Sequence, residues 1–166
     1  MKAAPAPFSK KDYALKSCAL LPLNRKNAVE MASALARMDL WKKIGYPAKA
    51  LEKHLLAPDK GLKRFRVECA GKTAGIICVR YPWLRGSYLD LLGIFANFQG
   101  QGLGRELIAW MEEQTSPACK NIWALVSSFN SSAREFYRKQ GFIETGTLRD
   151  LVKPGYDEIL IRKIIA

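Results

Sequence analysis

A short glycine-rich segment lies between an apolar stretch and an amphipathic one, and its residue types suit an anionic ligand. The segment consists of Gln99, Gly100, Gln101, Gly102, Leu103, Gly104 and Arg105. In a loop that opens a helix, backbone N–H groups point outward and the helix dipole adds partial positive charge, which favours a phosphate or pyrophosphate. Glycines let a ligand reach these amides because they have no Cβ. The segment is therefore predicted to bind a phosphorylated ligand.

Three interpretations of this segment compete. A Rossmann dinucleotide site needs G-x-G-x-x-G and an acidic residue about 20 positions later, but Arg105 takes the sixth position and the region around residue 122 is Ile-Trp-Ala. A Walker loop must end in Gly-Lys-Ser/Thr, and this segment does not. A tight turn without a ligand stays open when the segment is considered alone.

A carboxylate and a glycine interrupt the apolar strand expected before this segment. Asp90 lies in the apolar run from Tyr88 to Phe95 and shares a strand face with Leu92 and Ile94. It is either a general base at a site or an acid paired with one of the many basic residues, and the sequence leaves both open. Gly93, in the middle of the strand, favours a bulge or a close ligand approach over simple packing.

Hydrophobic periodicity and turn signals predict the elements that position these residues. Strands are expected over residues 15–23, 64–70, 73–81, 87–96, 121–128, 142–152 and 157–165. Helices are expected over residues 28–38, just before Pro58, over 102–114 and over 132–140. This order predicts one α/β domain over residues 1–166 (α+β by some conventions), with a mixed sheet of about seven strands and four helices. Residues 1–12 are expected to be a loose leader.

Two patterns on these elements resemble one known family. Residues 99–104 fit Q-x-x-G-x-G between a strand and a helix, and residues 130–142, NSSAREFYRKQGF, fit N-x-x-A-x-x-x-Y-x-x-x-G-F. Together they resemble the coenzyme A motifs of the GNAT superfamily of N-acetyltransferases, and the tail from Gly155 to Leu160 resembles its closing strand. The resemblance is good from about Thr73 onward and weak before it. One departure is Ala96, where the family often has proline.

The resemblance implies a V-splayed sheet, acetyl-coenzyme A as cosubstrate and no metal. It also implies that the pantetheine arm pairs with the central strand, that the pyrophosphate lies on the loop amides, and that Tyr137 protonates the departing thiolate. The cofactor-binding residues implied are Leu92, Gly93, Ile94, Gln99, Gly100, Gln101, Gly102, Leu103, Gly104, Arg105, Asn130 and Tyr137. Asn130 and Tyr137 are two helical turns apart, so they can face the same side.

The acceptor amine must lose a proton before it attacks, since a lysine-type amine titrates near 10.4 and an α-amine near 8. Asp90 is the candidate base, with ordered water as the alternative. Some family members carry a glutamate on the strand after the long helix, and Leu125 takes that place here. His54 lies outside the motifs and is expected to be a surface residue of its helix.

Composition limits the setting and the other classes of function. Lys and Arg number 27 against 15 acids, a formal charge of +12, which favours polyanions or simply a solvated surface. The four cysteines form no C-x-x-C pair, so free thiols in a reducing compartment are expected, and no zinc site. No apolar stretch reaches the length of a membrane span, so a cytoplasmic protein is expected.

Two rivals to an enzyme remain open. One is a basic nucleic-acid-binding module, for which Tyr81, Trp83 and Arg85 offer few interleaved aromatic residues. The other is a scaffold of the same fold that binds acyl-coenzyme A as a sensor without turnover. The acceptor is an unidentified amine, expected to be bounded by residues 39–60, 82–86 and 149–157, and a homodimer is left open.

Overall fold

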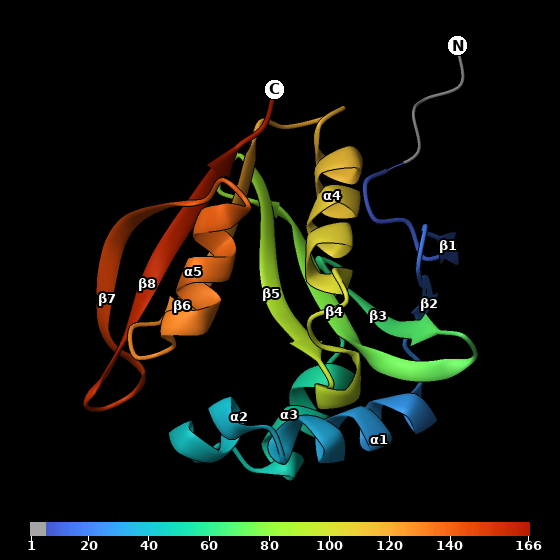
Figure 1. The fold of residues 1–166 in the computed structure, drawn as a ribbon, viewed down its shortest axis with the longest axis horizontal. Coiled ribbons are helices and arrows are strands. Elements are labelled where there is room, and N and C mark those ends of the chain that lie inside the picture. Colours follow the sequence, from blue (N-terminus) through green and yellow to red (C-terminus); the bar gives the residue numbers. More distant parts are fainter. Residues whose placement is uncertain (1–5) are drawn as a thin grey trace.

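One mixed sheet runs through the computed structural model, which describes residues 6–166 (Figure 1). Its eight strands lie in the order β1-β2-β3-β4-β5-β6-β8-β7. Their bounds are β1 Tyr13–Ala14, β2 Ala19–Pro22, β3 Leu62–Cys69, β4 Lys72–Trp83, β5 Gly86–Ile94, β6 Asn121–Ser127, β7 Ile143–Lys153 and β8 Tyr156–Ile164. The helices are α1 Arg25–Ala36, α2 Asp39–Ile44, α3 Ala48–Leu56, α4 Leu103–Thr115 and α5 Ser131–Lys139, with a 3₁₀ turn, η1, over Ala96–Phe98.

Helices cover both faces of the sheet because β4 is apolar on both sides. Ile77 and Val79 of β4 pack into one core cluster with α4, and the same cluster takes in α5. Ile76 and Cys78 alternate with them and pack into a second cluster with α1 and α3. In Figure 1, α4 and α5 accordingly lie on the near side of the sheet, and α1–α3 run across its lower end.

The sheet divides between β5 and β6, its one parallel pair. Register partners join these strands at Ser87–Leu89 of β5 and Ile122–Ala124 of β6 and nowhere further along. Beyond Leu89, β5 continues beside β4, whereas β6 continues beside β8 as far as Ser127. The two strands therefore part into a V, and the expected mixed, V-splayed sheet is confirmed.

Two elements were not predicted from the sequence. Strand β1 has only two residues, and it pairs with β2 at the edge of the sheet. Helix α2 has six residues and ends at Gly45, whose φ of 70° is the left-handed conformation that favours glycine. Neither element is long enough to show a hydrophobic period. The sheet thus has eight strands rather than about seven, and five α-helices cover it.

Two helices begin earlier than predicted, α1 at Arg25 rather than residue 28 and α5 at Ser131 rather than residue 132. Asn24 caps α1, and its side-chain oxygen accepts a hydrogen bond from the amide of Asn27 at 2.9 Å. Asn130 caps α5 by accepting from the amide of Ala133 at 3.2 Å. In both cases an asparagine just before the helix takes the role, since its short side chain reaches the free helix amides.

The expected loose leader over residues 1–12 is wrong at Phe8. This side chain is fully buried, and its ring lies 5.3 Å from that of Trp110 on α4 and 6.2 Å from that of Tyr81. The amide of Phe8 also donates to Gln114 Oε1 at 3.3 Å. Residues 1–5 of the predicted leader lie outside the described part of the chain.

The described helices and the four cysteines can be compared with what the sequence predicted. Across residues 6–166, no helix combines the length and the apolar character that crossing a bilayer requires. All four cysteines lie in this part of the chain and are free thiols. Burial raises the pKa of the Cys18 thiol to about 12 and also raises the pKa of the fully buried Cys78, so these thiols stay protonated at neutral pH.

Replacing Gly75 with alanine should destabilise the fold by distorting the β4–β5 pair. A Cβ at Gly75 would collide with the carbonyl oxygen of Gly93 on β5, and backbone atoms cannot move aside as a side chain can. We expect Gly75→Ala to lower the free energy of unfolding by roughly 1–3 kcal/mol, as overpacking in cores does, measured by urea denaturation. The control is Gly146→Ala on β7, where an added Cβ meets nothing within 4 Å. Equal stability of the two variants would contradict the close approach.

Candidate active site

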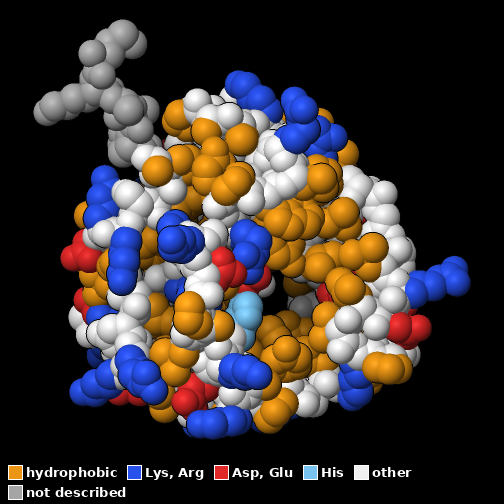
Figure 2. Space-filling view, turned by 180° about the vertical axis from the view of Figure 1, so that it is seen from behind, with side chains coloured by type: hydrophobic (Ala, Val, Ile, Leu, Met, Phe, Trp, Pro, Cys, Tyr) orange, Lys and Arg blue, Asp and Glu red, His pale blue; other side chains and the backbone are white. Residues whose placement is uncertain are grey.

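A cavity of about 210 Å³ lies where β5 and β6 part. Figure 2 shows the face of the molecule that carries a deep hollow, with the chain's single histidine at its edge. The cavity takes apolar walls from α2 and both strands, and polar groups from both arms of the V. The polar and titratable residues that line it are Tyr88, Asp90, Ser127, Asn130, Tyr137 and Glu158. The site therefore combines elements that are distant in sequence.

Asp90 enters this cavity from a β-bulge in β5. The register of the β4–β5 pair passes from Cys78↔Leu91 to Val79↔Leu89, so Asp90 has no partner of its own. A bulge bends its strand and re-aims a side chain. The sequence favoured a bulge or a close ligand approach at Gly93, and the structure places the bulge at Asp90 instead. Gly93 is a packing glycine after all, since a Cβ there would lie 2.7 Å from Leu35 Cδ2 of α1.

His54 of α3 lies against Asp90, which corrects the expectation of a plain surface residue. Its Nε2 atom is 2.7 Å from Asp90 Oδ2. The side chain of Asp90 is 13% exposed and that of His54 is 39% exposed, so the histidine lies on the solvent side of the pair. The sequence left two roles open for Asp90, a general base or one half of an ion pair. In the structure the neighbour of this carboxylate is an imidazole.

Tyr137 and Asn130 reach the cavity from α5, as their spacing predicted. The ring of Tyr137 packs edge-on against Phe136 at 5.1 Å and Phe142 at 5.3 Å, which fixes its direction. Burial, with a smaller contribution from nearby Tyr88, raises the pKa of the Tyr137 hydroxyl above its ordinary value. The hydroxyl therefore holds its proton at neutral pH. The side-chain oxygen of Asn130 caps α5, so its NH₂ group can donate to a ligand.

A second carboxylate, Glu158 of β8, lines the same cavity and was not among the predicted residues. It is 5% exposed, and Ser127 Oγ donates to its Oε1 at 2.7 Å. Burial raises the pKa of Glu158, and the hydrogen bond from Ser127 partly offsets this. Burial and the charges of Asp90 and Glu158 also raise the pKa of Tyr88. The charged groups that line the cavity are thus acidic in a chain whose formal charge is +12.

The glycine-rich segment forms the turn that opens α4. Gly100 and Gly102 have φ of 73° and 82°, and an added Cβ at either meets nothing within 4 Å, so the turn is open on its outer side. Gly102 caps α4 without a side-chain hydrogen bond, which leaves the first helix amides for a ligand. A left-handed turn with free amides fits a phosphate or pyrophosphate group.

The other residues of that segment divide between packing and support. Leu103 is buried in the core, so only its backbone can serve a ligand. Gly104 allows α5 to approach, since a Cβ there would lie 3.0 Å from Phe136 Cζ. Gln99 Nε2 donates to the carbonyl of Ile94 at 2.8 Å, and Gln101 Nε2 donates to the carbonyl of Asn97 at 3.1 Å. The Arg105 side chain is exposed on the first turn of α4.

The end of β5 offers one free edge toward the V. The carbonyl of Gly93 faces β4, where a Cβ at Gly75 would meet it, and the amide of Phe95 donates to Ala74 on the same side. Because backbone groups alternate along an antiparallel strand, those of Leu92 and Ile94 face the opposite, open edge. Of the predicted pairing segment, Leu92 presents its backbone groups to this edge and Gly93 does not. Ile94 presents its amide there, while its carbonyl accepts from Gln99 Nε2.

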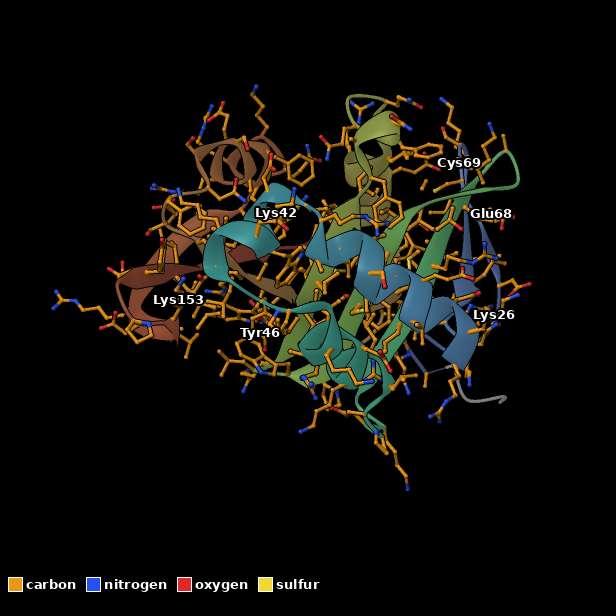
Figure 3. All side chains as sticks on the ribbon, turned by 90° about the horizontal axis from the view of Figure 1, so that it is seen from below. Lys26, Lys42, Tyr46, Glu68, Cys69 and Lys153 are labelled. Carbon is orange, nitrogen blue, oxygen red and sulfur yellow. The ribbon has the colours of Figure 1, made fainter. Side chains whose placement is uncertain are left out.

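Helix α2 walls the cavity from below, and it lies in one of the three segments expected to bound the acceptor. Trp41 lines the cavity, and its ring lies 5.8 Å from that of Tyr46. Lys43 places its Nζ 4.2 Å from the ring centroid of Phe129, which ties α2 to the far arm of the V. In Figure 3, Lys42 of α2 and Lys153 of β7 lie at the same end of the molecule.

Of the other expected segments, residues 149–157 contribute Val152 to the cavity. No residue of the 82–86 loop lines the cavity. Trp83 of this loop packs on Tyr88, with ring centroids 4.7 Å apart. The structure thus gathers Asp90, Asn130 and Tyr137 in one cavity and places the glycine-rich turn at the end of β5. Sequence reasoning missed His54 and Glu158. Glu158 carried the signal that identified Asp90, a carboxylate next to an apolar strand segment.

Comparison with known proteins decides the family. The sequence profile of the acetyltransferase (GNAT) domain matches residues 25–151, most of the chain. The chain belongs to the GNAT acetyltransferase family. No curated protein sequence matches it. Membership of this family makes the chain an acyltransferase whose cosubstrate is acetyl-coenzyme A. The open turn before α4 fits the phosphates of that molecule.

Solved structures show the same fold at low identity. An acetyltransferase from Thermus thermophilus is 19% identical with a TM-score of 0.72, over 92% of this chain and 100% of that one. A spermidine N-acetyltransferase chimera from Vibrio cholerae and hSSAT is 19% identical with a TM-score of 0.72, over 90% and 96%. RimL, a ribosomal L7/L12 alpha-N-protein acetyltransferase, in complex with coenzyme A, is 16% identical with a TM-score of 0.67, over 93% and 98%.

The described part of the acetyltransferase has no cluster suited to a metal. Within residues 6–166, no three or more His, Cys, Asp and Glu side chains are grouped so that they could hold an ion.

Placing a carboxylate at Gly102 should weaken binding of acetyl-coenzyme A. A glutamate there would lie beside the phosphate-binding amides, and like charges about 4 Å apart cost roughly 1–4 kcal/mol near a protein surface. We expect Gly102→Glu to lower the affinity at least about tenfold, measured by isothermal titration calorimetry. Gly155→Glu is the matched control, because Gly155 has a φ of 85° and open space around it but lies on the β7–β8 turn. A folded Gly102→Glu protein with the control's affinity would contradict the phosphate site.

Proposed function

We propose that the acetyltransferase transfers the acetyl group to an amine by direct attack while both substrates are bound. The observation that carries this proposal is that a carboxylate and a protonated tyrosine face one cavity from opposite arms of the V. Asp90 comes from β5 and Tyr137 from α5, so a base and an acid can act on the two sides of a carbonyl held between them. Acetyl-coenzyme A supplies an activated acyl group with a thiolate leaving group.

Tyr137 serves as the acid. Its hydroxyl keeps its proton at neutral pH because burial disfavours the phenolate. A thiol titrates near 8.5, so the departing sulfur gains from a proton without depending on it completely. The packing of the ring between Phe136 and Phe142 holds the hydroxyl in one direction and lowers the entropy cost of the transfer.

Asp90 serves as the base, and Glu158 helps to attract the substrate. An amine enters as an ammonium ion, and two carboxylates that line the cavity favour its charge. Asp90 lies nearer to solvent through His54, whereas Glu158 is 5% exposed and its Oε1 already accepts a hydrogen bond from Ser127. We assign the proton transfer to Asp90 and the attraction of the cation to both.

Direct transfer is supported by the positions of the thiols. The residues that line the cavity, all within the described chain, include no cysteine. Cys78 is fully buried behind β5 and its pKa is raised, while Cys119 lies near the hydroxyl of Tyr81, with Sγ 3.8 Å away. An acetyl-enzyme on a cysteine would therefore need a thiol that the cavity does not contain.

The acceptor is proposed as a primary amine, either a small molecule or the amino group of a peptide or protein. Proteins of this fold include one named for spermidine and one named for a ribosomal protein N-terminus, so both kinds are candidates. A screen of polyamines, amino-terminal peptides and aminoglycosides with a thiol-release readout would separate them. If acetyl-coenzyme A binds but no amine in the screen releases the thiol, a sensor is favoured instead.

Removing the hydroxyl of Tyr137 should slow turnover without weakening coenzyme binding. Tyr137→Phe keeps the ring and its packing, and general-acid catalysis contributes about 10²–10⁴-fold. We expect kcat to fall toward the low end of that range, about 10²-fold, with the dissociation constant of acetyl-coenzyme A unchanged. Tyr81→Phe is the control, since its hydroxyl faces Cys119. Unchanged kcat where the chemical step limits the rate would exclude Tyr137 as the acid.

Neutralising Asp90 should make turnover depend on the amine's own ionisation. Asp90→Asn keeps the shape of the side chain but cannot take a proton at neutral pH. We expect kcat/KM for a lysine-type amine to fall at pH 7 and the deficit to shrink as the pH rises toward about 10.4, where the amine deprotonates in solution. Thiol release measured from about pH 7 to about pH 9.5 tests this, with Asp59→Asn as control because Asp59 pairs with Arg80 at 2.8 Å. A deficit that stays constant with pH would argue against Asp90 as the base.

A further inference from the structure

His54 and Asp90 form a pair that crosses the wall of the cavity. Asp90 lines the cavity and His54 does not, yet His54 Nε2 lies 2.7 Å from Asp90 Oδ2. The exposed fraction of the side chain rises from 13% at Asp90 to 39% at His54. The pair thus leads from the inside of the cavity to solvent, and Figure 2 shows the histidine at the edge of the hollow.

Two features hold α3, and with it His54, in this place. Leu51 and Leu55 of α3 are buried at 1% and 3% exposure, which presses the helix onto the sheet. Arg64 of β3 donates from Nη2 to the carbonyls of His54 and Ala57, each at 2.9 Å, and so fixes the last turn of α3. The pair differs from an exposed ion pair, which contributes little to stability, because the Asp90 side chain is 13% exposed.

The bulge in β5 supplies the matching half of the pair. Because Asp90 has no register partner on β4, its side chain can face both the cavity and α3. Oδ2 faces His54 and leaves Oδ1 for the cavity. The carboxylate is therefore placed to receive a proton on one oxygen and to pass one on from the other.

We propose that His54 is the outlet for the proton that the acceptor amine loses, acting through Asp90. This inference rests on the proposed function and adds a residue that neither the family motifs nor the sequence identified. The amine enters as an ammonium ion and ends as an amide, so its nitrogen gives up two protons. One replaces the proton that Tyr137 gives to sulfur as the C–N bond forms and the C–S bond breaks. The other passes to Asp90, then from Oδ2 of Asp90 to the lone pair on Nε2 of His54 in the tautomer that carries its hydrogen on Nδ1, and from Nδ1 to water.

An outlet is useful because Asp90 must lose the proton that it takes before the next turnover, and its own side chain is 13% exposed. An imidazole changes charge near neutral pH, so it can accept a proton and release it within one turnover. The other charged or titratable groups around the pair are Arg64 of β3, Cys78 of β4, Tyr88 of β5 and Glu158 of β8. Burial raises the pKa values of Cys78 and Tyr88, so the thiol and the phenol stay neutral and do not compete for the proton. Glu158, whose pKa is also raised by burial, is 5% exposed, so a proton held there has no direct exit to solvent.

The decisive variant is His54→Gln, which can donate a hydrogen bond to Asp90 but cannot carry a proton. We expect kcat at pH 7 to fall about 10–10²-fold, below a full general-base contribution, with KM for acetyl-coenzyme A unchanged. Lys53→Gln is the control, because it removes a charge one position away on the exposed side of α3. If His54→Gln keeps the wild-type kcat and the wild-type pH profile, the histidine only orients Asp90 and the proposal is wrong.

Chemical rescue and a double variant separate transport of a proton from loss of structure. His54→Ala leaves a gap at a half-exposed position, so added imidazole should restore part of its kcat and should not restore that of Asp90→Asn. The double variant His54→Gln with Asp90→Asn should be no slower than Asp90→Asn alone, since groups on one route are not additive. Additive losses, or no rescue by imidazole in a protein that melts like the wild type, would overturn the proposal.

These results are distinguishable from a failure of the proposed function. If Tyr137→Phe and Asp90→Asn slow turnover but His54→Gln does not, the proposal of direct transfer is supported and the proposal that His54 is the proton outlet is wrong. If Asp90→Asn has no effect, Asp90 is not the base, and both the assignment of the base and the outlet are wrong. Thermal stabilisation by acetyl-coenzyme A, about 2.7 kcal/mol at a hundredfold excess over Kd, reports binding independently of turnover.

Discussion

The parting of β5 from β6 is the constraint on which the rest of the site depends. A parallel pair that stops after three residues leaves backbone groups on both strands without partners, and such groups must be satisfied by something else. β8 pairs with the far edge of β6 and β4 with the far edge of β5, so the two edges that face each other across the V are left for other partners. The open edge and the cavity between the arms follow directly, and so does the place of the turn that begins α4.

The charge of the cavity is opposite to that of the chain as a whole. The chain carries a formal charge of +12, yet the titratable groups facing the cavity are two carboxylates and two tyrosines. Burial penalises the charged form of each of the groups whose pKa it raises, which keeps Tyr137 and Tyr88 protonated. A basic surface can attract a phosphorylated cosubstrate while an acidic interior attracts an ammonium ion, so the two substrates are sorted by charge.

The sequence predicted the parts of the site whose chemistry depends on local order. Gly100 and Gly102 need a left-handed turn before a helix, and Asn130 and Tyr137 share one helix, so a motif of adjacent residues was enough to predict their grouping. His54 and Asp90 are 36 positions apart, and they meet only because a bulge turns one and a buried helix face fixes the other. Neither of these is visible in a hydrophobic period. The same limit applies to α2, which is too short for a period, and to Phe8, whose burial depends on Trp110, far along the chain.

The residues of helix α2 that line the cavity lie apart in the chain from those that form the turn before α4, and this separation has an evolutionary consequence. The turn before α4 and the motif of α5 lie in the second half of the chain, whereas Trp41 walls the cavity from a six-residue helix in the first half. Ile44 of that helix is buried and Trp41 packs against the core, whereas Asp39, Lys42 and Lys43 are exposed and Lys43 contacts the ring of Phe129. Mutations at the exposed positions of α2 can therefore alter the rim of the cavity for new amines at small cost in stability, while the turn before α4 keeps its own sequence.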